Sequence, residues 1–183
     1  MQSVNKSATT INPKKLLWLN QHYIKNSDNE KLIFILNSFF DDMNIPTDSG
    51  PDLSDLVSVQ KDRIETVKDL AEHSTFFYED FEKYDEKMAK KYLQPALLKP
   101  FRSLYNEFGN NASWDNESIK SILDKVAEGF DIKIGKLAQP LRVAITGKSV
   151  SPSIYDTVKL LGREKTLKRL NNAINFIESR GVS

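Results

Sequence analysis

Few residues in this chain have the types and spacing needed for covalent or metal chemistry. There is no cysteine, so disulfides, thiolate nucleophiles and cysteine-ligated metals are excluded. His22 and His73 lie far apart, and neither has metal-ligand spacing around it. The acidic pairs Glu79-Asp80 and Asp85-Glu86 are typical of a solvated surface segment. The sequence therefore predicts no metal site and no catalytic residues in this chain.

The Gly147-Lys148-Ser149 segment is the one fragment that suggests a nucleotide-binding loop. A phosphate-binding loop also requires a glycine five residues before its Gly-Lys pair, and that position is Arg142. No strand pattern leads into the segment, and the chain has no Gly-rich dinucleotide turn. We therefore expect this chain to bind no cofactor of its own.

Charge is unevenly distributed although the whole chain carries only +1. Residues 131–183 contain ten basic and four acidic side chains, whereas residues 1–130 have a net charge of −5. A basic end can attract a polyanion such as a nucleic acid. A solvated basic helix would have the same composition, so charge alone leaves the partner open.

Apolar residues recur at helical spacing along nearly the whole chain, and no segment has the alternation of a strand. Capping residues and breakers then set the limits of the helices. We expect Trp18 and Trp114 to belong to the core. Predicted helices cover 13–25, the segment after Asp28 to about residue 40, one long helix from about 53 to 70, then 87–93, 94–108, 114–129, 134–146, a helix opened by Ser151-Pro152 and ended by Gly162, and 163–177.

The predicted fold class is therefore all-α, with two packed helical subdomains. The stretch 74–87 mixes aromatic and acidic residues without clear periodicity, so we place a boundary there. The subdomains are residues 1–75 and 76–183. The N-terminus has no apolar run typical of a signal peptide, and the most apolar stretch, 32–36, is far too short to cross a bilayer. We expect a cytoplasmic monomer with no membrane association.

Two segments near opposite ends resemble one family. Asn12-Pro13-Lys14-Lys15-Leu16-Leu17-Trp18-Leu19-Asn20-Gln21-His22-Tyr23-Ile24 is similar to the Lys-Leu-x-Trp-(Leu/Met)-Asn-x-x-Tyr-Ile segment of bacterial glutamyl-tRNA synthetases. The second, Gly135-Lys136-Leu137-Ala138-Gln139-Pro140-Leu141-Arg142-Val143-Ala144-Ile145-Thr146-Gly147, resembles the closing anticodon-binding segment of that family and continues through Ser151-Pro152 and 160–170. The two segments bracket nearly the whole chain.

The resemblance implies the helical anticodon-binding part of a glutamate–tRNA ligase, with glutamate tRNA as partner. The family's His-x-Gly-His and Lys-Met-Ser-Lys-Ser motifs, which belong to its catalytic half, do not occur in this sequence. The resemblance therefore implies that ATP, magnesium and glutamate activation belong to a catalytic part of a longer parent enzyme. It also implies that this chain alone is inactive as a ligase.

By pattern alone, Arg142 and Arg63 flank apolar stripes of predicted helices, and Ser151-Pro152 is a helix start. The resemblance implies a further role for these residues, namely contact with anticodon bases. The implied base-contacting set is Arg142, Ser151, Pro152, Ile154 and Arg63, with Arg63 reading the third base. Four cations could contact backbone phosphates and so position the RNA, namely Lys148, Lys159, Arg163 and Lys165.

Two other function classes stay open. A helical protein–protein interaction module without RNA binding would also fit the charge asymmetry and the stripe edges. An enzyme complete in itself is disfavoured because no nucleophile, metal cluster or cofactor loop is predicted. RNA affinity that falls steeply with salt would separate the anticodon-binding interpretation from the interaction module.

Overall fold

The computed structural model describes residues 12–181, and this part of the chain is helical without a strand. The predicted all-α class is confirmed. The elements are α1 (Pro13–Asn26), α2 (Asn29–Asp42), α3 (Leu53–Gln60), α4 (Val67–Ser74), the 3-10 turn η1 (Thr75–Phe77), α5 (Glu86–Tyr92), the 3-10 turn η2 (Pro95–Leu97), α6 (Leu98–Asn110), α7 (Asn116–Gly129), α8 (Ile134–Thr146), α9 (Ile154–Leu161) and α10 (Arg163–Gly181). No helix among the described residues is both long enough and apolar enough to span a membrane.

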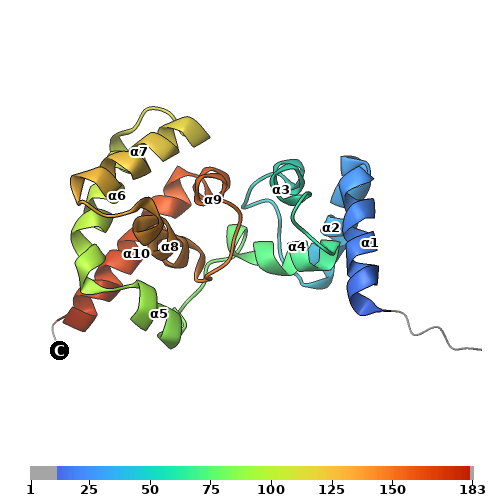
Figure 1. Ribbon diagram of the computed structural model, residues 1–183, viewed down its shortest axis with the longest axis horizontal. Helices are drawn as coiled ribbons and strands as arrows, with labels where there is room; N and C mark the ends of the chain where they lie inside the picture. Colours follow the sequence, from blue (N-terminus) through green and yellow to red (C-terminus); the bar gives the residue numbers. More distant parts are fainter. Residues whose placement is uncertain (1–11, 182–183) are drawn as a thin grey trace, which may run out of the picture.

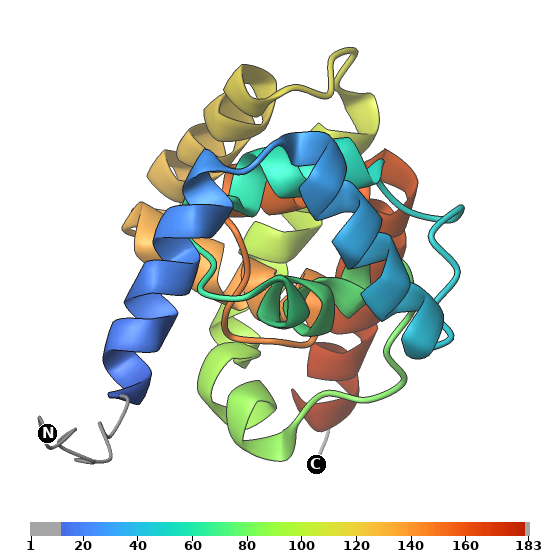
Figure 2. The same cartoon turned by 90° about the vertical axis from the view of Figure 1, so that its right-hand side faces the viewer.

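The helices gather at the two ends of an elongated molecule (Figure 1). α1–α4 lie at one end and α5–α10 at the other, with α8 and α10 near the centre of the second group. Viewed along the long axis, α1 crosses the outer face of its end of the molecule (Figure 2). The predicted subdomain boundary after residue 75 falls inside η1, and this division stays a prediction.

Two helix starts and one helix end follow local capping chemistry. The Asn12 side chain accepts a hydrogen bond from the Lys14 amide, and Pro13 occupies the first position of α1. Asp28 caps α2 in the same way through the Glu30 amide. Gly147 ends α8 with φ of +67°, in the left-handed region that glycine adopts without a Cβ penalty. These three predicted boundaries are confirmed.

The prediction of one long helix from 53 to 70 is wrong. α3 ends at Gln60, and a turn follows in which the Arg63 amide donates to the Gln60 carbonyl. α4 then begins after Thr66, whose hydroxyl caps the Asp69 amide at 2.9 Å. Because the apolar spacing continues across the turn, periodicity alone cannot detect the break. Arg63 consequently lies in a turn and not on a helix face.

The predicted start of the helix at Ser151-Pro152 is also wrong. Ser153 is the capping residue, its hydroxyl accepts from the Asp156 amide, and α9 begins at Ile154. Trp18 likewise does not belong to the core, since 64% of it is exposed on α1. Trp114 does pack against the core. Its ring meets the Phe108 ring edge-on at 5.4 Å, and the Arg163 guanidinium lies 5.2 Å from the Trp114 ring centre.

A buried arginine fixes the segment that connects the two groups of helices. Arg169 on α10 is only 2% exposed. Its guanidinium donates to the carbonyls of Phe76 (2.8 Å), Glu79 (3.0 Å) and Ile145 (2.8 Å), and forms an ion pair with Asp80 at 3.0 Å. This one side chain therefore joins α10, the end of α8, η1 and the segment after η1.

Candidate functional site

Arg142 leaves α8 on the side of the loop that joins α8 to α9. It is half-buried, and its Nη1 donates to the Ser151 hydroxyl and to the Pro152 carbonyl. Burial lowers the pKa of its guanidinium, which still stays protonated at neutral pH because the ordinary value is so high. Nε and Nη2 have no hydrogen-bond partner within residues 12–181. These N–H groups are oriented by the loop and available to an external acceptor.

The loop itself is held by its own polar groups. The Thr157 hydroxyl lies 2.8 Å from the Ser151 hydroxyl, and it is fully buried. The Thr146 hydroxyl accepts from the Lys148 amide at 3.0 Å, and Gln139 Nε2 donates to the Ser149 carbonyl at 2.8 Å. The position of Ser151 is thus set by contacts from both α8 and α9.

The Arg63 turn faces this loop across a hollow of about 340 Å³. One wall consists of residues from the end of α3, the turn and α4, and the other of Val150, Ser151 and Pro152. The first wall is lined by Gln60, Arg63, Ile64, Glu65, Asp69, Leu70 and His73. The structure therefore brings Arg63, Ser151 and Pro152 to one hollow, with Arg142 hydrogen-bonded to its rim.

Ile154, like Pro152, is a buried member of the predicted base-contacting set. It is the first residue of α9 and is 5% exposed, packed within the hydrophobic core. Ile154 does not line the hollow that Arg63 and Ser151 share. Its side chain supports the loop from beneath, and little of its surface is open to a ligand.

The four cations predicted to contact phosphates are placed in different ways. Lys148 is half-buried and donates to the Glu72 carbonyl at 3.0 Å, and this burial lowers its pKa. Lys165 donates to the carbonyls of Ser49 (2.6 Å) and Phe77 (2.8 Å), and burial likewise lowers its pKa.

The other two cations lie on and beside α9. Arg163 sits over the Trp114 ring at 5.2 Å and donates weakly to the Ser113 carbonyl at 3.4 Å. Lys159 is exposed on α9. Phosphate contact by the four cations stays a prediction; for Lys148 and Lys165 it requires the ammonium to share its donors with internal carbonyls.

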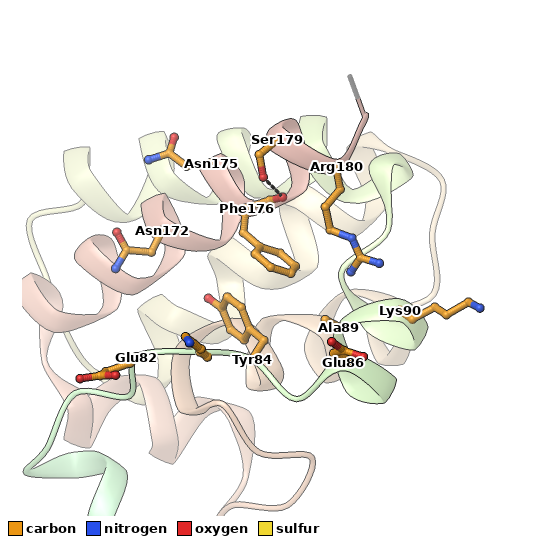
Figure 3. Close-up of a pocket in the computed structure, with 11 residues that line it drawn as sticks. Glu82, Tyr84, Glu86, Ala89, Lys90, Asn172, Asn175, Phe176, Ser179 and Arg180 are labelled. Atoms are coloured by element: carbon orange, nitrogen blue, oxygen red, sulfur yellow. Dashed lines mark hydrogen bonds between the residues drawn. The ribbon is translucent and has the colours of Figure 1, made fainter. Parts of the chain in front are cut away.

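A further hollow of about 900 Å³ lies elsewhere, between α5, α10 and the segment before α5. Figure 3 shows Tyr84 and Phe176 facing each other inside it, with Glu82, Glu86, Lys90 and Arg180 around them. It contains none of the predicted site residues. Its carboxylates and cations are mixed, so it presents no surface of one sign.

Sequence reasoning missed several residues of the shared hollow. His73, which has no metal-ligand spacing in the sequence, lines the hollow with its Nδ1 2.7 Å from the Asp69 carbonyl. Val150 is 66% exposed at the opposite wall. Buried Gln60 donates to Ser74 at 3.1 Å and completes the floor. Only the folding of the loop against α3 and α4 brings them together, so no local signal could have found them.

The side chains around the shared hollow suit recognition of a ligand by hydrogen bonds. Arginine N–H groups, a hydroxyl and a hollow of this size suit hydrogen-bonding to the edges of an unstacked base. Within residues 12–181, no cluster of three or more His, Asp or Glu side chains is arranged to hold a metal ion.

Comparison with known proteins identifies the family. A family model described as an anticodon binding domain matches residues 27–174. Glutamate–tRNA ligase of Legionella pneumophila (strain Paris) is 39% identical over 180 residues, which are 98% of this chain and 38% of that protein. Glutamate–tRNA ligase 1 of Nitrosococcus oceani is 41% identical over the same shares.

Solved structures agree. The crystal structure of a glutamate tRNA ligase from Elizabethkingia meningosepticum, in complex with its amino acid, superimposes with a TM-score of 0.82 at 26% identity, covering 95% of this chain and 34% of that one. The chain thus spans little more than a third of the relatives it matches. It belongs to the anticodon-binding domain family, and within it to the type found in glutamate–tRNA ligases.

Proposed function

We propose that this chain reads the anticodon of glutamate tRNA for a glutamate–tRNA ligase that acts as a monomer in the cytoplasm. Glutamate attachment, which uses ATP and magnesium, then takes place in a catalytic part outside this sequence, and the chain alone is inactive as a ligase. The observation that carries the proposal is the juxtaposition of Arg63, Ser151 and Pro152 at one hollow, with Arg142 held at its rim.

Each wall of the hollow has its own role in the proposal. Arg142 donates from Nε and Nη2 to one base, while the Ser151 hydroxyl and the Pro152 ring bound the space beside it. Arg63 approaches from the opposite wall and contacts a neighbouring base. Ile154 keeps the loop in position from the core, and Lys148, Lys159, Arg163 and Lys165 provide positive charge toward the phosphates.

The test is binding of the chain to two tRNAs, one with a glutamate anticodon and one with a single anticodon base changed. We expect the cognate tRNA to bind more tightly, and Arg142→Ala to remove about 1–3 kcal/mol of that preference. Arg102→Ala is the matched control, because this exposed arginine pairs with Glu178 away from the hollow. Tight binding without anticodon preference, unchanged by Arg142→Ala, would contradict the site.

Arg63 provides a separate test of specificity. We propose that its guanidinium disfavours the third anticodon base of glutamine tRNA. In a complete ligase carrying this domain, Arg63→Gln should then raise charging of glutamine tRNA relative to glutamate tRNA. Unchanged relative charging of the two tRNAs would remove Arg63 from the set of base-contacting residues and leave the others in place.

A further inference from the structure

We propose that a second groove, on the N-terminal half of α8, binds a single-stranded nucleotide that flanks the anticodon. The inference rests on the proposed function, since it assigns another part of the same RNA to another surface of the same domain. The groove measures about 830 Å³ and lies between the end of α5, η2 and the first turns of α8. Its main residues are Lys91, Tyr92, Lys133, Ile134, Lys136 and Gln139.

The charge of this groove is of one sign. Lys91, Lys133 and Lys136 are all exposed at its rim, and no carboxylate lines it. Four other hollows on the described residues each include at least one Asp or Glu. Three lysines without a compensating carboxylate produce a positive potential that favours a polyanion. No side chain caps the start of α8, so the positive end of its helix dipole adds to that potential.

The floor of the groove is apolar and includes an aromatic ring. Tyr92 is half-buried, with the Lys91 ammonium 4.9 Å from the centre of its ring. Ile134 is 37% exposed, and Leu97 and Pro140 complete the floor. A nucleotide matches both parts, because its base stacks on an aromatic ring while its phosphate pairs with lysines. An acidic peptide would use the lysines but not the ring.

Gln139 links the groove to the loop of the proposed anticodon site. Gln139 lines the groove, and its amide donates to the Ser149 carbonyl in the loop that carries Ser151. Lys136 and Arg142 are separated by six residues of one helix, which is about 9 Å along its axis. An RNA strand whose bases enter the shared hollow can therefore continue across Gln139 into the groove.

The groove should affect affinity without affecting base preference, because phosphate contacts carry no sequence information. The combined variant Lys91→Ala, Lys133→Ala and Lys136→Ala should lower the slope of log affinity against log salt by about 2, at roughly 0.7 per contact to single-stranded RNA. For a fourfold rise in salt, wild-type affinity should then fall about 20-fold more than that of the variant. Both tRNAs should weaken equally.

Two further variants separate the nucleotide from other occupants. Tyr92→Leu should weaken binding about tenfold through the lost stacking contact, while Tyr92→Phe keeps the ring and should restore it. The matched control for charge is Lys25→Ala with Lys31→Ala and Lys120→Ala, three exposed lysines outside the groove. Thermal unfolding of each variant shows whether it remains folded.

The outcomes distinguish this inference from the proposed function. An unchanged salt slope in the three-lysine variant would overturn the groove, whether or not Arg142→Ala affects anticodon preference. Equal competition by polyglutamate and by single-stranded RNA, without an effect of Tyr92→Leu, would assign the groove to an acidic peptide and also overturn it. A reduced slope in a domain with no anticodon preference would support the groove and contradict the anticodon site.

Discussion

The Arg142 side chain is held in place by the loop after α8. Its Nη1 is bound to Ser151 and Pro152, so the direction of Nε and Nη2 is set by the loop. A long side chain that is ordered in advance loses less rotamer entropy when it forms a contact. This preorganisation favours the role of specific donor that we propose for Arg142, which an unrestrained surface arginine would perform less well.

Gly147 controls where that loop leaves α8, and replacing it provides a prediction at the scale of one residue. Its φ is +67°, and an added Cβ would lie 3.1 Å from the Phe81 ring. Gly147→Ala should therefore destabilise the fold by about 1–2 kcal/mol, since an L residue pays for the left-handed conformation. Urea unfolding measures the change.

Gly129→Ala is the matched control, because no atom lies within 4 Å of a Cβ added there and its φ is ordinary. It should be neutral or slightly stabilising, since alanine is the better helix former. Equal stabilities for the two alanine variants would contradict the strain assigned to Gly147.

At the scale of the element, helix starts could be predicted where the signal is local. Asn12 and Asp28 bind amides two residues away, so their capping role is visible in the sequence. Thr66 caps α4 just as locally, but it sits inside an unbroken apolar spacing that favours one long helix. Arg169 could not be predicted, because its partners Phe76, Glu79 and Ile145 come from distant segments.

The connection between the two groups of helices depends on Arg169, and this dependence can be measured. Arg169→Leu removes a buried cation, leaves three carbonyls without this donor and leaves Asp80 with Lys168 alone. We expect a loss of about 3–5 kcal/mol in the free energy of unfolding. Lys168→Ala removes the other cation from Asp80, but that pair is exposed and should cost less than about 1 kcal/mol. Similar losses in the two variants would show that Arg169 is not the main connection.

Asp80 should make the same connection sensitive to acid. The hydrogen bond from Lys168, together with Arg169, holds the pKa of this carboxyl below its usual value. A carboxyl with a lowered folded pKa stabilises the fold above its unfolded pKa of about 4, and this contribution disappears as pH falls through the folded pKa. The melting temperature of Asp80→Asn should therefore fall less steeply than that of wild type below about pH 4. Asp62→Asn, in the exposed turn after α3, should retain the wild-type slope.

At the scale of the whole molecule, the two candidate RNA surfaces meet at α8. One lies between the loop after α8 and the turn between α3 and α4, and the other lies beside the first turns of α8. The basic C-terminal third therefore carries Arg142, Lys133 and Lys136, whereas the acidic first part contributes the Arg63 wall. In the proposed function, the basic part attracts the RNA, and the acidic part offers Arg63 as its contact. The uneven charge alone leaves the partner open, but the structure shows which surfaces the basic side chains line.

Replacing each of the two tryptophans would show how much each end of the molecule depends on its tryptophan for stability. Trp114 joins the segment before α7 to α9 through a hydrogen bond from its indole to the Val158 carbonyl at 3.3 Å, and its ring packs on Phe108 of α6. Trp18 lies on the outer face of α1, stacked only on the exposed His22 ring at 6.0 Å. Trp114→Ala should therefore lower the free energy of unfolding by about 2–4 kcal/mol. Trp18→Ala should change it by less than about 0.5 kcal/mol, since surface substitutions seldom do more. Urea titrations followed by circular dichroism give both values, and a larger loss for Trp18→Ala would mean that α1 is packed more deeply than its exposure indicates.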